Sequence, residues 1–181
     1  MPCWEQRSQA IRLHTSDMEP LHAALRAAGW HVDEERARGS LRSFIVTQPY
    51  GGTVRPVWGG TVWHDGVGEI AVLRSNDDAE PLVHAISSVW VADRLRVACR
   101  KYQWTLAPVP GGYVMKKQGA SIKVKVLPGG KVRMTTGSIP SAIHAQAGEL
   151  LKSAAALLGG GPVTVEHEKP MEQHHHVHTH T

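Results

Sequence analysis

The chain has 181 residues, of which 41% are hydrophobic and 20% charged, and its formal net charge is +4 at pH 7. This composition excludes wholesale disorder and allows one ordinary domain or two small ones. No run of about 18 apolar residues is present to cross a bilayer, and the first residues lack the apolar stretch of a secretory signal. Cys3 and Cys99 are too few for a disulfide framework or a zinc site. We therefore expect a cytoplasmic protein without a membrane-spanning segment.

The first elements in chain order are a short strand at residues 10–14 and an amphipathic helix. Ser16 and Glu19 have the spacing of a capping box, in which the two side chains satisfy the first free amides of a helix. Apolar residues then recur at helical spacing as far as Ala28, and Gly29 supplies a left-handed stop. The pattern predicts one short helix.

Residues 30–74 predict an antiparallel meander. Short β-branched or aromatic runs, broken by glycine and proline, lie near 30–35, 41–47, 54–63 and 68–73. The segment His64-Asp65-Gly66 is typical of a hairpin turn, because Asp-Gly permits the backbone angles of tight turns.

A long helix and a hairpin follow the meander. The helix is expected from about 79 to 101, with Asn76 or Asp77 as its cap and a wide apolar face. The hairpin pairs 104–107 with 113–116 across a turn rich in proline and glycine.

A second unit is predicted after the segment Gln118-Gly119-Ala120. It comprises a hairpin at 121–127 and 131–136, a helix that starts near Pro140 and runs to Leu158, and a closing strand at 162–166, with Ser138 or Ser141 as the helix cap. The sequence therefore predicts an α+β fold: an antiparallel sheet covered by helices in residues 1–117, a small ββαβ module in 121–168, and a disordered His-rich tail in 169–181. Whether the two modules share one sheet stays open.

Basic residues are concentrated between Val91 and Arg133, where Asp93 is the one acid. The basic residues are Arg94, Arg96, Arg100, Lys101, Lys116, Lys117, Lys123, Lys125, Lys131 and Arg133. Such a stretch, 94–133, can meet nucleic acid or an acidic partner protein. Lysines that alternate with apolar residues, as in 122–126, are also typical of the solvent face of a half-buried strand. No aromatic-rich strand or helix-turn-helix pattern accompanies the charge.

The C-terminal tail is rich in histidine. Its candidate metal ligands are His174, His175, His176, His178 and His180. Imidazoles at this density bind Zn(II), Ni(II) or Cu(II). Three interpretations stay open: a metal-binding or metal-sensing tail, a tail whose metal affinity is incidental, and a purification remnant.

No catalytic motif is present in the sequence. Neither a GxSxG serine nor a Cys-His signature occurs, and the paired glycines at 51–52 and 59–60 do not lead into a helix as a phosphate loop would. His64 beside Asp65 has the form of an oriented base, although a turn explains the pair as well. Cys99 lies on an apolar helical stripe and is expected to be buried. An enzyme is therefore not expected.

Several segments carry a resemblance to known families. They are Ser16-Asp17-Met18-Glu19-Pro20-Leu21, Ala27-Ala28-Gly29-Trp30, Arg36-Ala37-Arg38-Gly39 and the helix around Val89-Trp90-Val91-Ala92-Asp93-Arg94-Leu95. Through them residues 9–117 resemble the family of uncharacterised conserved reading frames first noted in plastid and cyanobacterial genomes. Residues 122–158 resemble a small domain of unknown function that is associated with neighbouring genes.

The resemblance implies an accessory protein, encoded near AAA-type ATPases or a small ferredoxin, and it offers no catalytic residues. The leading hypothesis is accordingly a non-enzymatic adaptor that binds a protein partner, with an AAA-type ATPase as the candidate. The six tryptophans support it if Trp4, Trp58, Trp63 or Trp90 is exposed as an interface anchor, whereas buried tryptophans would simply fill the core. Metal binding by the tail and nucleic-acid binding by 94–133 are the alternatives.

Overall fold

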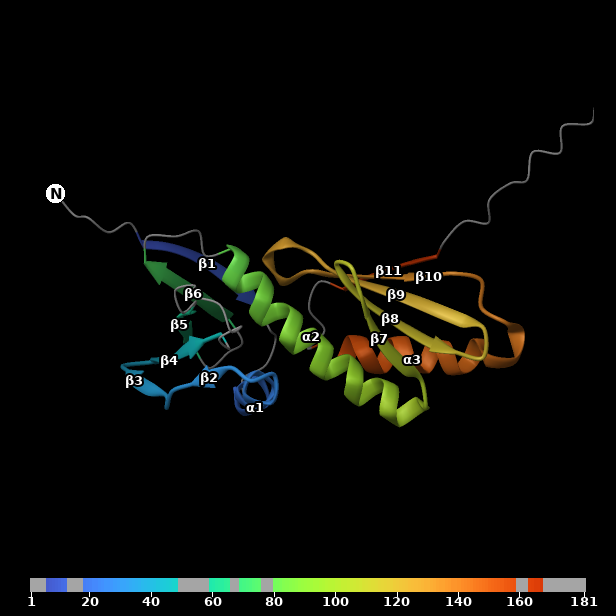
Figure 1. The fold of residues 1–181 in the computed structure, drawn as a ribbon, viewed down its shortest axis with the longest axis horizontal. Helices are drawn as coiled ribbons and strands as arrows, with labels where there is room; N and C mark the ends of the chain where they lie inside the picture. Colours follow the sequence, from blue (N-terminus) through green and yellow to red (C-terminus); the bar gives the residue numbers. More distant parts are fainter. Residues whose placement is uncertain are drawn as a thin grey trace, which may run out of the picture.

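The computed structural model describes residues 6–12, 18–48, 59–65, 69–75, 80–158 and 163–167, and it confirms the predicted α+β class (Figure 1). The predicted turn glycine Gly66, the caps Asn76 and Asp77, and the tail 169–181 lie outside these residues. The described residues form two sheets, and each predicted strand and helix has a counterpart among them. In the described residues no helix is both long and apolar enough to cross a membrane.

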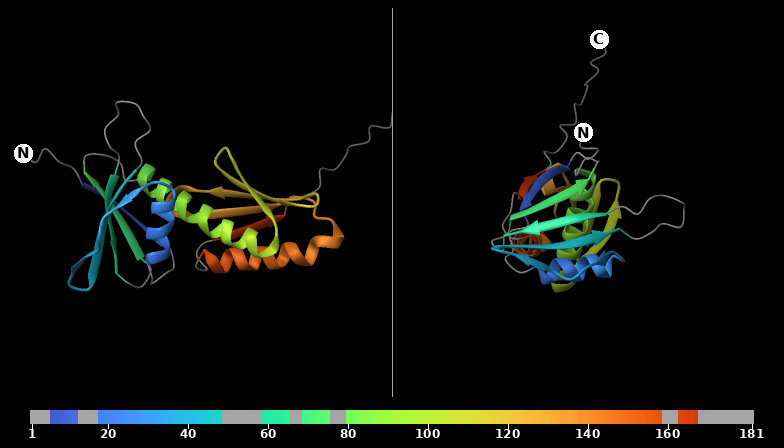
Figure 2. Two further views of the ribbon diagram at one scale, coloured as in Figure 1. Left: turned by 60° about the horizontal axis from the view of Figure 1, so that its bottom comes forward. Right: turned by 90° about the vertical axis from the view of Figure 1, so that its left-hand side faces the viewer.

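The first sheet has six strands and is antiparallel throughout. Its order is β1 (Gln6–Arg12), β6 (Glu69–Ser75), β5 (Gly59–His64), β4 (Leu41–Thr47) and β2 (His31–Val32), while β3 (Arg36–Arg38) also pairs with β4. The short helix α1 (Glu19–Ala27) lies against this sheet (Figure 2). Phe44, Val46 and Val62 are buried on the covered face, so alternation along β4 and β5 separates core from solvent.

The second sheet has five strands, in the order β11 (Val163–His167), β10 (Val132–Thr136), β9 (Ala120–Val126), β8 (Gly112–Lys117) and β7 (Thr105–Val109). The four strands β7 to β10 form an antiparallel meander, with the short helix η1 (Pro128–Gly130) between β9 and β10. β11 is parallel to β10. A parallel neighbour needs a crossover connection, and η2 (Ser141–Ile143) followed by α3 (His144–Leu157) provides it.

Helix α2 (Glu80–Tyr102) joins the two sheets. Its first turns lie beside the first sheet, and its C-terminal half runs next to α3 under the second sheet (Figure 2). The helix buries a wide face, as its two apolar stripes predict: Leu82, Val83, Ile86, Ser87, Trp90, Val91, Leu95, Ala98 and Cys99. These residues connect the apolar residues of both sheets into one continuous core.

The predicted boundary at 118–120 does not separate the two sheets. β8 and β9 pair along their whole length, from Gly112 opposite Lys125 to Lys117 opposite Ala120. Gln118 and Gly119 form the tight turn between them, with φ of 45° and 84°. The hairpin assigned to the first module therefore belongs to the second sheet, and the break between the sheets falls at α2.

The predicted helix caps differ from those observed. α1 begins after Met18 and α3 after Ile143, and neither N-cap residue makes a side-chain capping hydrogen bond. Ser16, predicted to cap α1, lies outside the described residues, and Ser141 instead opens η2. Gly29 does have the expected left-handed conformation, with φ of 86°. The buried residues Leu21, Ala24 and Leu25 hold helix α1 against the sheet.

Candidate functional site

The basic residues predicted as an interface fall into separate groups. Lys116, Lys123, Lys125 and Arg133 are exposed on strands β8, β9 and β10, whereas Arg96 and Arg100 are exposed on α2. Other members of the stretch have local roles. The ammonium of Lys117 donates to the carbonyl oxygen of Tyr102 at 2.8 Å, which satisfies the end of α2.

Arg94 is held on the surface of α2 by two neighbours. Its guanidinium is ion-paired with Asp93 and lies 4.6 Å from the centre of the Trp90 ring. A cation so placed is attracted to the face of the indole. Arg94 is therefore engaged within its own helix and adds little to a binding surface.

The exposed cations of the second sheet share one face. Ile122, Val124 and Val126 alternate with Lys123 and Lys125 along β9, and these three apolar residues are buried. Lys125 lies opposite Arg133 on β10, and Lys123 lies opposite Thr135. On the other side, Lys116 of β8 lies opposite Ser121. We call this surface, formed by Lys116, Lys123, Lys125 and Arg133, the basic face.

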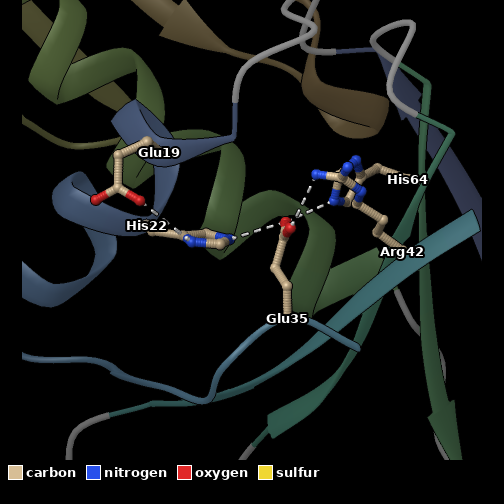
Figure 3. Close-up of polar contacts among 5 residues, drawn as sticks. All are labelled: Glu19, His22, Glu35, Arg42 and His64. Atoms are coloured by element: carbon tan, nitrogen blue, oxygen red, sulfur yellow. Dashed lines mark hydrogen bonds and ion pairs between the residues drawn. The ribbon is translucent and has the colours of Figure 1, made fainter. Parts of the chain in front are cut away.

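A second polar cluster lies where α1 meets the first sheet (Figure 3). His22 of α1 and His64 of β5 are only 6% and 4% exposed. Between them stands Glu35, from the segment that joins β2 to β3. The Nε2 of His64 donates a hydrogen bond to Oε1 of Glu35 at 2.7 Å, and the Nε2 of His22 is 3.7 Å from the same oxygen. Arg42 of β4 approaches the other carboxylate oxygen at 3.7 Å.

Burial and the neighbouring carboxylates act in opposite directions on the pKa of His22. Burial lowers the pKa of His22, while the carboxylates of Glu35 and then Glu19 oppose that shift. The Phe44 ring also meets His22 edge to face, with centroids 4.3 Å apart. Within the described residues, neither Nε2 of His22 nor Nδ1 of His64 has a hydrogen-bond partner. A close hydrogen bond from His64 to Glu35 thus ties the segment before β3 to the sheet, and His22 approaches the same carboxylate from α1.

A polar hollow of about 320 Å³ borders the cluster, lined by Met18, Glu19, His22, Arg26, Asp33, Glu34, Glu35, Arg42 and His64. No group of three His, Cys, Asp or Glu side chains within the described ranges is arranged to hold a metal ion. His64 directs its Nε2 to Glu35 and not to the adjacent Asp65. This hydrogen bond therefore does not support the prediction that His64 and Asp65 form an oriented base.

Sequence reasoning missed Glu35. Its partner His64 is 29 positions away in the chain, and Glu35 belongs to no motif. The one available signal was a run of three acids, Asp33, Glu34 and Glu35, at the end of the strand predicted near 30–35. Such a run is typical of an exposed segment, so it indicated no cluster.

The other singled-out residues are mostly in the core. Trp30, Trp90 and Trp104 are buried and Trp63 is half-buried, while Trp4 and Trp58 lie outside the described residues. Cys99 is 3% exposed, and burial raises its pKa to about 11. The five tail histidines, His174, His175, His176, His178 and His180, also lie outside the described residues.

Comparison of the chain with protein-family models, with curated proteins and with solved structures found no match.

Proposed function

We propose that this chain is a non-enzymatic binding protein that docks an acidic segment of a partner protein on its basic face. One observation carries the proposal. The five-stranded sheet buries one side against α2 and α3, and its other side presents four exposed cations on three adjacent strands. Residues 105–136, which form β7 to β10, contain neither Asp nor Glu, and the one acid of the fifth strand, Glu166, is paired with Thr135 in the strand register.

The strand register keeps the positive charges close together. Lys125 and Arg133 are directly opposite each other, and Arg133 and Lys123 also interact with further groups of the chain. A bound carboxylate would accept hydrogen bonds from the exposed ammonium group of Lys125. The positive charge of this face supports an acidic partner.

The same face favours a protein partner over nucleic acid. The register places Thr105, Ala107, Val114 and Ser121 beside the cations, so the face has no aromatic residue among these positions. Single-stranded nucleic acid is bound largely by stacking on aromatic side chains. An AAA-type ATPase as the partner remains a prediction of the resemblance, and metal binding by the tail remains a separate prediction.

The test is fluorescence anisotropy with two labelled probes of matched net charge: a glutamate-rich peptide and a single-stranded oligonucleotide. Lys116→Gln/Lys125→Gln removes two cations from the basic face. Arg36→Gln/Arg38→Gln removes two exposed cations from β3 and is the matched control. We expect the peptide to bind, and the first variant to weaken binding about tenfold or more, while the control binds as the unmodified chain does.

Two results would overturn the proposal. Equal loss of peptide affinity in both double variants would mean that net charge, not the basic face, controls binding. Tighter binding of the oligonucleotide at the same salt concentration, lost in Lys116→Gln/Lys125→Gln, would assign the face to nucleic acid.

A further inference from the structure

A groove of about 530 Å³ lies between α1, the C-terminal half of α2 and the β7–β8 hairpin. It is thus lined by the helix of the first sheet and by a hairpin of the second sheet. Alanines form much of its lining: Ala24, Ala27 and Ala28 come from α1 and its end, and Ala92 comes from α2. Because a methyl group fills so little space, two helices can lie side by side and still leave room between them. The volume is within the range of about 300 to 1,000 Å³ that is usual for small-molecule sites.

The remaining walls are apolar with few polar groups. Val89, Leu106 and Trp104 line the groove. Trp104 is 5% exposed, and its buried indole N–H has no hydrogen-bond acceptor within the part of the chain that the structure describes. A buried donor without an acceptor is unfavourable. The Tyr113 hydroxyl is already engaged, because it donates to the carbonyl oxygen of Ser88 at 3.4 Å.

Two guanidinium groups give the groove its charge. Arg96 and Arg100 are one helical turn apart on α2, both are exposed, and neither forms an ion pair within the described residues. Among the described residues of the lining, Asp93 is the one acid, and it is engaged with Arg94. The groove is therefore apolar inside and positive at its edge.

From this arrangement we infer that the groove binds a small apolar carboxylate. The carboxylate pairs with Arg96 and Arg100, since guanidinium and carboxylate form strong paired hydrogen bonds. The hydrocarbon body lies over the alanines and against Leu106 and Trp104. This site is separate from the basic face and does not depend on the proposed function.

Isothermal titration calorimetry of the full chain tests the inference with three probes of equal chain length. These are octanoate, octylammonium and octanol, which differ in the charge of the head group. We expect octanoate to bind, octanol to bind at least about tenfold more weakly, and octylammonium to give no measurable heat. Equal affinity for octanoate and octanol would reduce the site to non-specific apolar association and overturn the inference.

Variants locate the site on the molecule. Arg96→Gln/Arg100→Gln removes the charged edge, and Ala27→Leu places a larger side chain in the groove at an exposed helical position. Each is expected to lower octanoate affinity about tenfold or more. The matched controls Arg36→Gln/Arg38→Gln and Lys116→Gln/Lys125→Gln are expected to leave it unchanged. Octanoate affinity that survives in both groove variants, with circular dichroism unchanged, would refute the assignment.

Discussion

The two sheets of this protein manage polar groups in opposite ways. Around the first sheet, two polar side chains are buried: His22 of α1 and His64 of β5 are almost inaccessible, and His64 is hydrogen-bonded to the more exposed Glu35. The second sheet keeps its covered side mostly apolar and sends its cations to the open side. A buried polar group depends on its partners, whereas an apolar core depends on shape. We call each sheet with its covering helices a unit, and we expect different perturbations to destabilise the two units.

The largest effect is expected from adding one methyl group to the second sheet. A Cβ at Gly112 would lie 1.9 Å from the carbonyl oxygen of Val124, which is too close for any side chain. Gly112→Ala should therefore force β8 away from β9 and lower the free energy of unfolding by more than about 4 kcal/mol. Urea denaturation measures the loss, and hydrogen exchange should locate it in 105–136 more than in 31–64.

Gly148 is the control for that substitution. It lies inside α3, and a Cβ there would meet nothing within 4 Å. Gly148→Ala should raise stability by about 0.5 to 1 kcal/mol, because glycine is costly in a helix interior. A similar loss in both variants would show that close packing at Gly112 is not the cause.

A smaller loss is expected when the first unit loses its central carboxylate. Glu35→Ala leaves the buried N–H of His64 without its acceptor, which should cost about 1 to 3 kcal/mol. The neighbouring Glu34 is exposed, and Glu34→Ala should change stability by less than about 0.5 kcal/mol. Hydrogen exchange should show the loss in β2 to β5. Equal effects of the two substitutions would mean that the cluster contributes no stability.

The sequence predicted the elements well and their assembly less well. Alternation along β9 and the helical spacing of α2 are local patterns, so they identify each element. The turn at Gln118 and Gly119 looks like a linker in sequence, yet it joins two paired strands. Only the register shows that β7 and β8 extend the second sheet.

The contact between Glu35 and His64 and the groove could not be predicted from the sequence, for a related reason. The Glu35–His64 hydrogen bond spans 29 positions, and no local pattern reports such a contact. The groove is built from alanines, and the absence of side-chain volume has no sequence signature of its own. The basic stretch was visible, but only the strand register divided it between the basic face and the groove edge.

Lowering the pH should destabilise the first unit through protonation of His22. Because burial lowers the pKa of His22 below the value of about 6.5 in an unfolded chain, the unfolded state binds the proton more readily. Stability is then fully present above about pH 6.5 and is lost as the pH falls through that value toward the lower pKa of the folded state. The groups facing His22 are Glu19, Glu35, Arg26 and His64. Urea denaturation across this range should show the free energy of unfolding decrease as the pH falls, and this dependence on pH should be weaker in His22→Gln. An identical dependence in the variant would assign it to other groups.

The smallest effect concerns Cys99, which lies on α2 where the two units share one core. Its burial raises its pKa to about 11, so the thiol is almost wholly protonated at about pH 8, and only the thiolate reacts with a disulfide reagent. Labelling should therefore be slow in the native protein and limited by opening of the core around α2. Gly112→Ala, which opens the second sheet, should accelerate labelling more than Glu35→Ala, which loosens the first. The reverse order would mean that access to Cys99 is controlled by the first unit, and that the core across α2 opens from the side of the histidine cluster.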